Sequence, residues 1–577
     1  MAIAITYGER QHQDQQSFIG ALLSPGSGAE SFKAGDGAVA SGSHAVAIGQ
    51  GATGQGSECT VIGHGAWVHS ASTLSTAIGH YARVDTGNGT AVGHNAYCGS
   101  SYSVALGYDA RVNGVYGSAI GYASRSGGTS ATAFGYDAVA NRNYCTAIGR
   151  SAEAGGTFSG DYCTALGYLA SAYASSNQAA TAIGANTTAS GPGSTVVGYN
   201  STTSSNNAVG LGSNCSATQT GAMAMGALSV GSGQYAVAIG YQGQAVQTSA
   251  VAIGRASYCS GTSGVAVGPF TDATGAYCTA VGGYAQATNS SVTAVGYSAN
   301  GLGQYATLLG VSTAIPATSS GGTALGYNSK VWDNTDYGIA LGFQAQVGNN
   351  STGAAHNSIA IGYQAQVDSL VSNSVAIGPS AHVNGINSVG IGPGVSCFTR
   401  NVAIGSSASC PVSDAVAIGY NAIALAQWCT AIGATASASA LRTTAVGYGA
   451  SCASSDGLAV GYNASSGANY TVVVGVGASA NQAGGVALGD SSAVTHTNGV
   501  ALGNGAVSTA ANRCTIGTIA GAYDLELQVG KGFGAFGVAP PSSQPTKITD
   551  PTDLSSALTA IASIIDVLEG AGLASST

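Results

Sequence analysis

Large and small apolar residues alternate around a recurring glycine along most of this sequence. The phrase Val-Ala-Ile-Gly at 46–49 and its variants occur 33 times up to Gly517, and 24 of the 32 spacings between these glycines are 14 residues. The position before the glycine is aliphatic in every copy except Phe134 and Met225, and the position two before it is Ala in 26 copies. A fixed period of this kind indicates a repeat architecture.

Each 14-residue unit is expected to contain two short strands. The residues before the glycine alternate large and small, as at Val104 and Val416, and a second alternation begins three residues after it, usually with Ala. Strands this short do not fold alone, so successive units are expected to stack in register about 4.7–4.9 Å apart. The sequence predicts an all-β parallel β-solenoid, a β-roll of 14-residue coils, over residues 35–520 and on the order of 155 Å long.

A coil this small is expected to enclose only its own aliphatic side chains, so we expect any function on the outside or at the ends. Open sheet edges at the ends would pair with other chains unless they are covered. Residues 1–34 are therefore predicted to be an N-terminal cap or attachment segment. Residues 521–549 are predicted to form a strand and a Gly/Pro-rich connector.

The recurring phrase, followed by Ala at the third position, resembles the head repeat of YadA-like trimeric adhesins, over about 470 residues. The resemblance implies that the β-roll is left-handed and that three chains form an obligate homotrimer. It also implies display at a surface, where the roll binds host molecules.

The C-terminal segment carries a second resemblance. Leu525, Leu527 and Val529 alternate with polar residues, and a Gly-rich stretch and the run Ala-Pro-Pro at 539–541 follow. This order, closed by a helix, is similar to the ends of many tailed-phage fibre proteins. It implies a virion fibre.

A helix is predicted over residues 550–577. Asp550 can cap its N-terminus and Pro551 suits its first turn. Its apolar residues are spaced like a coiled-coil seam, which favours a trimerising helix: Leu554, Leu558, Ile561, Ile565 and Leu568. The alternative is that this helix packs back onto its own chain.

Composition narrows the choice of partners. Only 14 Lys and Arg accompany 23 Asp and Glu, and the net charge is −9. Nucleic acid is therefore not an expected partner, because phosphate contacts need clustered basic residues. The first 23 residues lack the pattern of a secretory signal, and no stretch reaches the roughly 18 apolar residues of a membrane helix. We expect no membrane insertion and no cofactor.

The twelve Cys mostly occupy positions that otherwise hold small residues, so we expect buried fillers. Cys145 and Cys163, like Cys397 and Cys410, fall in neighbouring coils, where a disulfide is the less favoured alternative. No Cys pairs have zinc-type spacing, and we expect no metal site.

Aromatic residues also keep one register. Tyr follows the repeat glycine in 12 copies, and His64, His80 and His94 hold the same position in three consecutive coils. Stacking in register predicts an aromatic ladder along one corner. A sugar-binding stripe and a histidine metal site are the less favoured alternatives.

Departures from the 14-residue period mark candidate binding loops, because insertions in solenoids project from one face. Four consecutive spacings between Gly310 and Gly378 are 16, 16, 20 and 16. This stretch supplies the candidate receptor contacts Lys330, Trp332, Asp333, Asp336, His356 and Asp368. The alternative is that these loops merely tolerate insertion. A smaller irregularity, with spacings of 18 and 17, lies between Gly149 and Gly184.

Catalysis finds little support. A glycosidase needs two carboxylates about 5 to 10 Å apart in a groove, and Asp333 and Asp336 are the best available pair. No nucleophile elbow or phosphate loop is present. We therefore expect no enzyme and no catalytic residue.

The patterns together predict a homotrimeric, non-catalytic tail-fibre-like virion protein that presents a host-recognition surface. Its expected partners are other virion or tail proteins, reached through one terminus, and a host receptor or glycan. We expect it at the virion surface, after synthesis in the host cytoplasm without a signal peptide. A secreted cell-surface adhesin is the alternative, and a glycan-cleaving tailspike is a third hypothesis.

Overall fold

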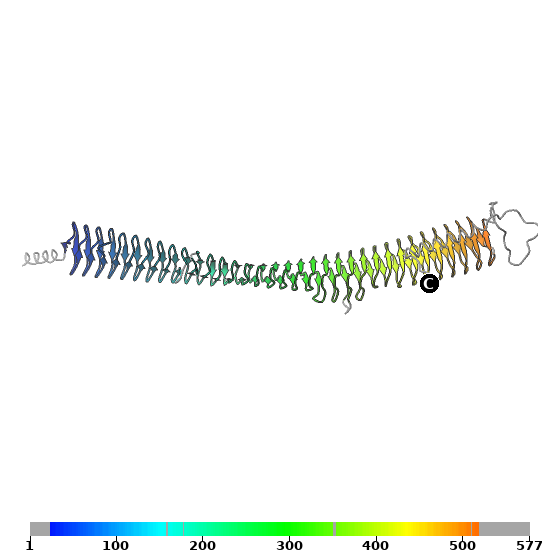
Figure 1. Ribbon diagram of the computed structural model, residues 1–577, viewed down its shortest axis with the longest axis horizontal. Coiled ribbons are helices and arrows are strands. Elements are labelled where there is room, and N and C mark those ends of the chain that lie inside the picture. The colour runs from blue at the N-terminus through cyan, green and yellow to red at the C-terminus, as the bar shows by residue number, and fades with distance from the viewer. Residues whose placement is uncertain (1–22, 157–159, 177, 350–353, 509, 518–577) are drawn as a thin grey trace, which may run out of the picture. The chain divides into compact units, whose positions relative to one another are not determined.

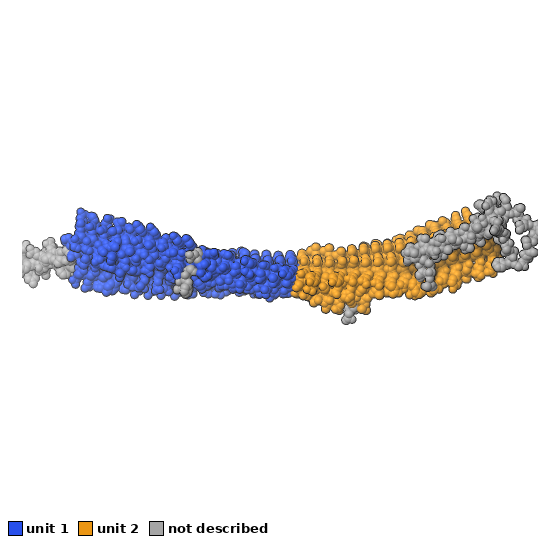
Figure 2. Space-filling model, viewed as in Figure 1, with its two compact units in different colours: residues 1–284 blue, residues 285–577 orange. Residues whose placement is uncertain are grey.

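Parallel β-solenoids make up both compact units of this chain. The computed structural model describes residues 23–517, except 157–159, 177, 350–353 and 509. The two units comprise residues 1–284 and 285–577 (Figure 2). Together they contain about 34 turns, and the described residues contain no α-helix (Figure 1). The predicted fold class is confirmed; its handedness and the trimer stay predictions. The helix expected at 550–577 and the 521–549 connector lie outside the described residues.

Each turn contributes one strand to each of two parallel sheets. Even-numbered strands occupy the three residues before each repeat glycine, with β24 (Thr195–Tyr199) and β26 (Val209–Ser213) extended to five. From β3 onward, odd-numbered strands occupy the fourth and fifth residues after it. In unit 1, the even-numbered series runs from β2 (Phe32–Ala34) to β36 (Thr279–Val281), and the odd-numbered series runs from β3 (Val39–Ala40) to β35 (Asp272–Ala273). In unit 2, the even-numbered series runs from β38 (Thr293–Val295) to β68 (Cys514–Ile516), and the odd-numbered series runs from β37 (Gln286–Ala287) to β67 (Val507–Ser508).

Equivalent positions of successive turns pair in register, as the period predicts. In unit 1, β30 (Val237–Ile239) pairs parallel with β32 (Val251–Ile253), so that Val237 lies opposite Val251. The backbone N–H of Gly254 donates to the carbonyl of Ile239 at 2.7 Å. Each turn thereby satisfies the amide groups of its neighbour, which two- and three-residue strands cannot do alone.

The repeat glycine is required by the corner that it forms. Gly240 has a φ of 122°, a backbone conformation that L side chains rarely adopt. A Cβ at this position would collide with the carbonyl group of Gly254 in the next turn, 2.7 Å from its carbonyl carbon. The glycine therefore allows both the corner and the close approach of successive turns.

The core is a thin column of small side chains. In the turn around Gly240, the residues that point inward are Ala236, Ala238, Gly243 and Ala245, and all are buried. Eleven of the twelve Cys are buried and all twelve are free thiols, so their predicted role as buried fillers is confirmed except at exposed Cys514. Where a large residue enters, a small one faces it, because a Cβ on Gly301 would lie 2.8 Å from Cδ1 of Leu308.

The bulky aliphatic residues of the repeat lie on the outside. The position before each repeat glycine points away from the core; Leu106 is 43% exposed and Leu309 is 50% exposed. Ala, two positions before the glycine, faces inward instead. Each unit therefore carries a row of Ile, Val and Leu along the outer face of its even-numbered strands.

A short antiparallel strand covers the first edge of unit 1. β1 (Leu23–Pro25) pairs with β2, and Leu23 lies opposite Ala34. The other edge of β2 pairs with β4 (Val46–Ile48). β1 thereby protects an edge that would otherwise be free to pair with another chain.

Candidate functional site

The inserted residues of unit 2 all lie between an odd-numbered strand and the next even-numbered strand. The odd-numbered strands keep their parallel pairing across the insertions, so that Gln346 lies opposite Gln366 although 20 residues separate them. The extra residues therefore form loops on one side of the solenoid (Figure 1). The strands that carry these loops are β41 (Ala314–Ile315), β43 (Lys330–Val331), β45 (Gln346–Val347) and β47 (Gln366–Val367).

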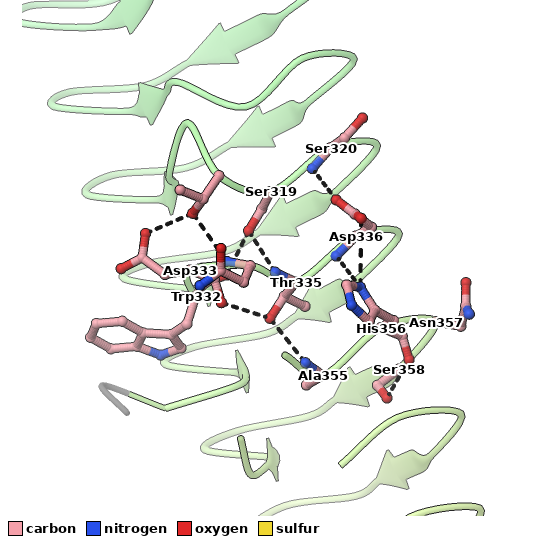
Figure 3. A network of polar contacts seen from close by, with 12 residues as sticks. Ser319, Ser320, Trp332, Asp333, Thr335, Asp336, Ala355, His356, Asn357 and Ser358 are labelled. Atoms are coloured by element: carbon pink, nitrogen blue, oxygen red, sulfur yellow. Dashed lines mark hydrogen bonds and ion pairs between the residues drawn. The ribbon is translucent and has the colours of Figure 1, made fainter. Parts of the chain in front are cut away.

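Buried hydroxyl groups join three successive loops (Figure 3). The Oγ of Ser319 donates to the carbonyl of Trp332 at 2.7 Å and accepts the N–H of Thr335 at 2.9 Å. The Oγ1 of Thr335 in turn accepts the N–H of Ala355 at 3.3 Å. Ser319 and Thr335 are both buried. The loops are therefore anchored to one another, and the anchor holds the backbone of Trp332.

Three of the predicted contact residues brace these loops. Thr318 donates from Oγ1 to Asp333 at 2.9 Å, and the N–H of Ser320 donates to Asp336 at 2.8 Å. The N–H of Asp336 donates to Nδ1 of His356 at 3.0 Å. Since Nδ1 accepts this bond, the proton of a neutral ring lies on Nε2. Asp333, Asp336 and His356 thus hold neighbouring loops together.

Trp332 lies across the following turn. Its Nε1 donates to Oε1 of Gln346 at 3.4 Å. A Cβ on Gly348 would lie 3.0 Å from the Cβ of Trp332, so glycine leaves room for this side chain. The Nζ of Lys330 lies 5.1 Å from the centroid of the Trp332 ring, a cation–π distance.

A polar hollow of about 350 Å³ lies beside Trp332, on the outer face of the odd-numbered strands. Three consecutive turns line it, each with one residue before and one residue after a buried alanine. The lining residues are Gln344, Gln346, Gln364, Gln366, Ser380 and His382. Its volume falls within the range of small-molecule sites, about 300–1,000 Å³.

An ion pair closes the end of the hollow away from Trp332. The Nε2 of His382 lies 3.0 Å from Oδ2 of Asp368, and Gln366 donates to the other oxygen of Asp368 at 2.6 Å. The hydrogen bond and the charge of Asp368 raise the pKa of His382 above its ordinary value, although burial opposes them. Burial raises the pKa of Asp368, but its bonds to His382 and Gln366 and the charge of His382 outweigh burial, so this pKa lies below its ordinary value.

The six predicted contact residues therefore divide into two groups. Trp332 and Asp368 contact residues that line the hollow, and Lys330 contacts Trp332. Asp333, Asp336 and His356 brace the loops instead.

The residues that line the hollow were missed by the sequence prediction. The phrase Gln-Ala-Gln-Val occurs at 344–347 and again at 364–367, in the same register of successive turns. That repetition is a signal from which the two rows of amide side chains could have been found.

The predicted aromatic ladder is confirmed in unit 1. Six rings stack in succession with centroids 4.7–5.0 Å apart, at His64, His80, His94, Tyr108, Tyr122 and Tyr136. The three imidazoles lie nearly parallel. Desolvation and, after it, the neighbouring His94 and His64 lower the pKa of His80. Within the described part of the chain, no group of three or more His, Cys, Asp or Glu residues could hold a metal ion.

A second aromatic cluster, not predicted from the sequence, lies on the odd-numbered strands of unit 1. The guanidinium of Arg83 lies 4.4 Å from the ring centroid of Trp67 and 5.6 Å from that of Tyr97. The same Arg83 donates to Asp85 at 2.6 Å, and the hydroxyl of Tyr97 donates to Asp85 at 2.8 Å. Arg83, Tyr97 and Asp85 are thus paired with one another, and the cluster has the features of a structural clasp between turns.

The closed coils, their filled interior and their variable outer face define a β-solenoid repeat protein. A family model of two copies of the YadA head domain repeat matches the chain at intervals throughout the described repeats. The matched residues are 34–52, 72–96, 101–124, 126–152, 175–201, 232–257, 317–345, 347–368, 372–394, 430–450 and 480–506. The chain therefore carries YadA head domain repeats and is similar to YadA-like head-repeat proteins, which indicates an adhesin-like fibre at an extracellular surface.

No curated protein matches the chain. Among the residues that the structure describes, no helix has the length and apolar character needed to cross a membrane.

Proposed function

We propose that this protein is a homotrimeric, non-catalytic fibre of a virus particle, of the tailed-phage type, and that it presents a host-recognition surface. One observation carries the proposal: YadA head repeats recur along the chain in turns whose interior is filled by their own small side chains. Such turns leave recognition to the outer face. The longest run of departures from the 14-residue period, between Gly310 and Gly378, adds polar and aromatic residues to that face.

The outer face of the even-numbered strands supports the trimer. Each unit exposes a row of Ile, Val and Leu there, with half-exposed side chains such as Leu309. Soluble monomers rarely expose continuous apolar surface beyond a few hundred Å². Packing of three chains along this row would bury it, in keeping with the trimeric state of YadA-like proteins. The coiled-coil spacing from Leu554 to Leu568 in the sequence supports the same state.

The inserted loops and the adjoining hollow of unit 2 are the proposed contact with the host surface. They combine Trp332, amide side chains and an ion pair on a firmly braced base. Three copies on one fibre raise the avidity of an individually weak contact through effective concentration. The proposed partners are a host receptor or glycan and, through one terminus, other proteins of the virion.

Two measurements on the full-length protein test the proposal. Native mass spectrometry should give three times the mass of one chain; a single-chain mass contradicts the trimer. Labelling of purified virus particles with an antibody to this chain, viewed by electron microscopy, should decorate an appendage. Particles without label contradict the virion role.

The family match also favours a second candidate, a secreted cell-surface adhesin, because the YadA head repeat is an adhesin repeat. Label on intact producing cells, together with unlabelled particles, would favour this candidate.

A glycan-cleaving tailspike is distinguished from the proposed fibre by its enzymatic activity. A tailspike should shorten a host polysaccharide, and Asp333→Ala or Asp336→Ala should abolish this cleaving activity. The proposed fibre should leave the length of the polysaccharide unchanged.

A further inference from the structure

Two parallel rows of outward side chains form the hollow of unit 2. In the turns that follow Gly342 and Gly362, a buried alanine separates two glutamines, which therefore both point outward. Gln344 and Gln364 form one row, and Gln346 and Gln366 form the other. Because neighbouring turns lie about 4.8 Å apart, three turns give a trough roughly 10 Å long.

Each glutamine side chain is held by one hydrogen bond and keeps a free hydrogen-bonding group. Gln364 donates from Nε2 to Oε1 of Gln344 at 2.9 Å. Gln366 donates to Asp368, and Gln346 accepts from Trp332. In the described structure this leaves the amide nitrogens of Gln344 and Gln346, and the amide oxygens of Gln364 and Gln366, without a protein partner. The trough therefore offers donors and acceptors side by side.

The trough has no excess positive charge to attract an anion. Its lining is four amides, one hydroxyl and His382, whose charge when it is protonated is matched by Asp368 3.0 Å away. The nearby Lys330 lies over the ring of Trp332. No arginine lines the trough. Arginine is the side chain best suited to bind carboxylate or phosphate groups, because it forms two parallel hydrogen bonds with them.

Aromatic rings border the same turns. Trp332 reaches over Gln346 at one end. Phe343 and Tyr363, each next to a lining glutamine in sequence, are exposed and stack with centroids 5.3 Å apart. Phe343 is also stacked on Tyr327 at 5.1 Å, so both of its faces are covered. The ring that can offer an apolar face to the C–H groups of a ligand is therefore that of Trp332.

Fixed amide donors and acceptors, the neighbouring ring of Trp332 and the absence of excess positive charge together suit an uncharged ligand rich in hydroxyl groups. We propose that the trough lined by Gln344, Gln346, Gln364 and Gln366 binds an uncharged saccharide chain. This inference rests on the proposed function, since it names the class of host molecule that the inserted loops of unit 2 recognise.

Calorimetric titration of the full-length protein tests the inference. The probes are neutral oligosaccharides (maltotriose, cellotriose and tri-N-acetylchitotriose) and anionic ones (sialyllactose and oligogalacturonate). At least one neutral probe should bind, and the double variant Gln346→Ala/Gln366→Ala should weaken its binding at least tenfold. Trp332→Phe should weaken it less than Trp332→Ala, because phenylalanine keeps an aromatic face.

Gln286→Ala provides the matched control. Gln286 occupies the same position of its turn, on the outer face of β37 in the same unit, and lies outside the trough. Its replacement should leave saccharide affinity unchanged.

Binding of the anionic probes alone, binding that the double variant leaves intact, or no binding of any neutral probe would each overturn the inference. If the fibre still decorates virions and attaches to host cells in any of these cases, only the saccharide assignment is wrong. The proposed function then stands.

Discussion

Replacement of the repeat glycine by alanine is the most direct test of how the turns stack. We choose Gly240 because the same turn contains a second glycine, Gly243, in a different environment. Gly240 has a φ of 122°, and its added Cβ would collide with the carbonyl group of Gly254. Gly243 is buried at a position that holds Ala in many other turns, and an added Cβ there meets nothing closer than 3.4 Å.

The magnitude follows from these two environments. An L residue in the conformation of Gly240 costs about 1–3 kcal/mol of strain, and the collision with the next turn adds about 1–3 kcal/mol. We therefore expect Gly240→Ala to destabilise the surrounding turns by about 3 kcal/mol or more. Gly243→Ala should be neutral or stabilise the protein by up to about 1 kcal/mol, because alanine restricts the unfolded chain.

Hydrogen exchange measures this effect locally, which matters because stability in a solenoid is largely a nearest-neighbour property. The N–H of Gly254, bonded to Ile239 at 2.7 Å, reports the contact between the two turns. A loss of about 3 kcal/mol corresponds to exchange that is on the order of a hundredfold faster. Equal exchange rates in Gly240→Ala and Gly243→Ala would refute the reasoning that the corner glycine permits close stacking.

Three further predictions concern packing and pH. Leu308→Ala should reduce the free energy of unfolding in urea by about 2–5 kcal/mol, and Leu309→Ala by about 0.5 kcal/mol or less, because Leu308 is buried and Leu309 is half exposed; similar values for both would contradict the inward and outward assignment. The raised pKa of His382 and the lowered pKa of Asp368 predict that their ion pair gives its full stabilisation of the folded protein between about pH 4 and 6.5. Its contribution is lost above this window as His382 releases its proton and below it as Asp368 is protonated; urea unfolding across pH should show this, and Asp368→Asn should abolish it. The lowered pKa of His80 predicts the opposite sign: stability in unit 1 falls as pH drops below about 6.5, and an NMR titration of His80 at or above the ordinary value would contradict this.

Periodicity was sufficient to predict the strands but not which face of them is buried. Alternation has the same period for both faces of a strand, so Ile48 and Ala47 are equivalent by pattern alone. The structure buries Ala47 and exposes Ile48, because four inward positions share one narrow coil that admits only small side chains. Strand positions, the register and the buried Cys follow from the spacing of the glycines. The inward or outward direction follows from the cross-section of the closed coil.

The candidate site was predicted in position but not in composition. Irregular spacing correctly located the inserted loops, and polar residues within them were the natural candidates. The structure engages Asp336 and His356 in bracing, since loop backbone that leaves the sheet must find new hydrogen-bond partners. The hollow instead depends on residues in the strand segments of these turns, such as Gln346 and Gln366. Their alignment becomes visible only when turns of unequal length are superposed on their glycines.

The division between inward and outward positions explains how recognition can change without loss of the fold. Interior positions and corner glycines determine stacking, and this requirement persists across the inserted turns, where Ala340 still pairs with Ala360. The spacing between successive glutamines within each row is therefore set by the sheet, at about 4.8 Å. The loops supply Trp332 and the bracing hydroxyls. Substitutions at outward positions alter the chemistry of the trough at little cost to stability. The length of a loop determines which side chains lie beside the trough. We accordingly expect ligand specificity to respond to changes at Gln344 and Gln364, while changes at the buried Ala345 between the rows act on stability.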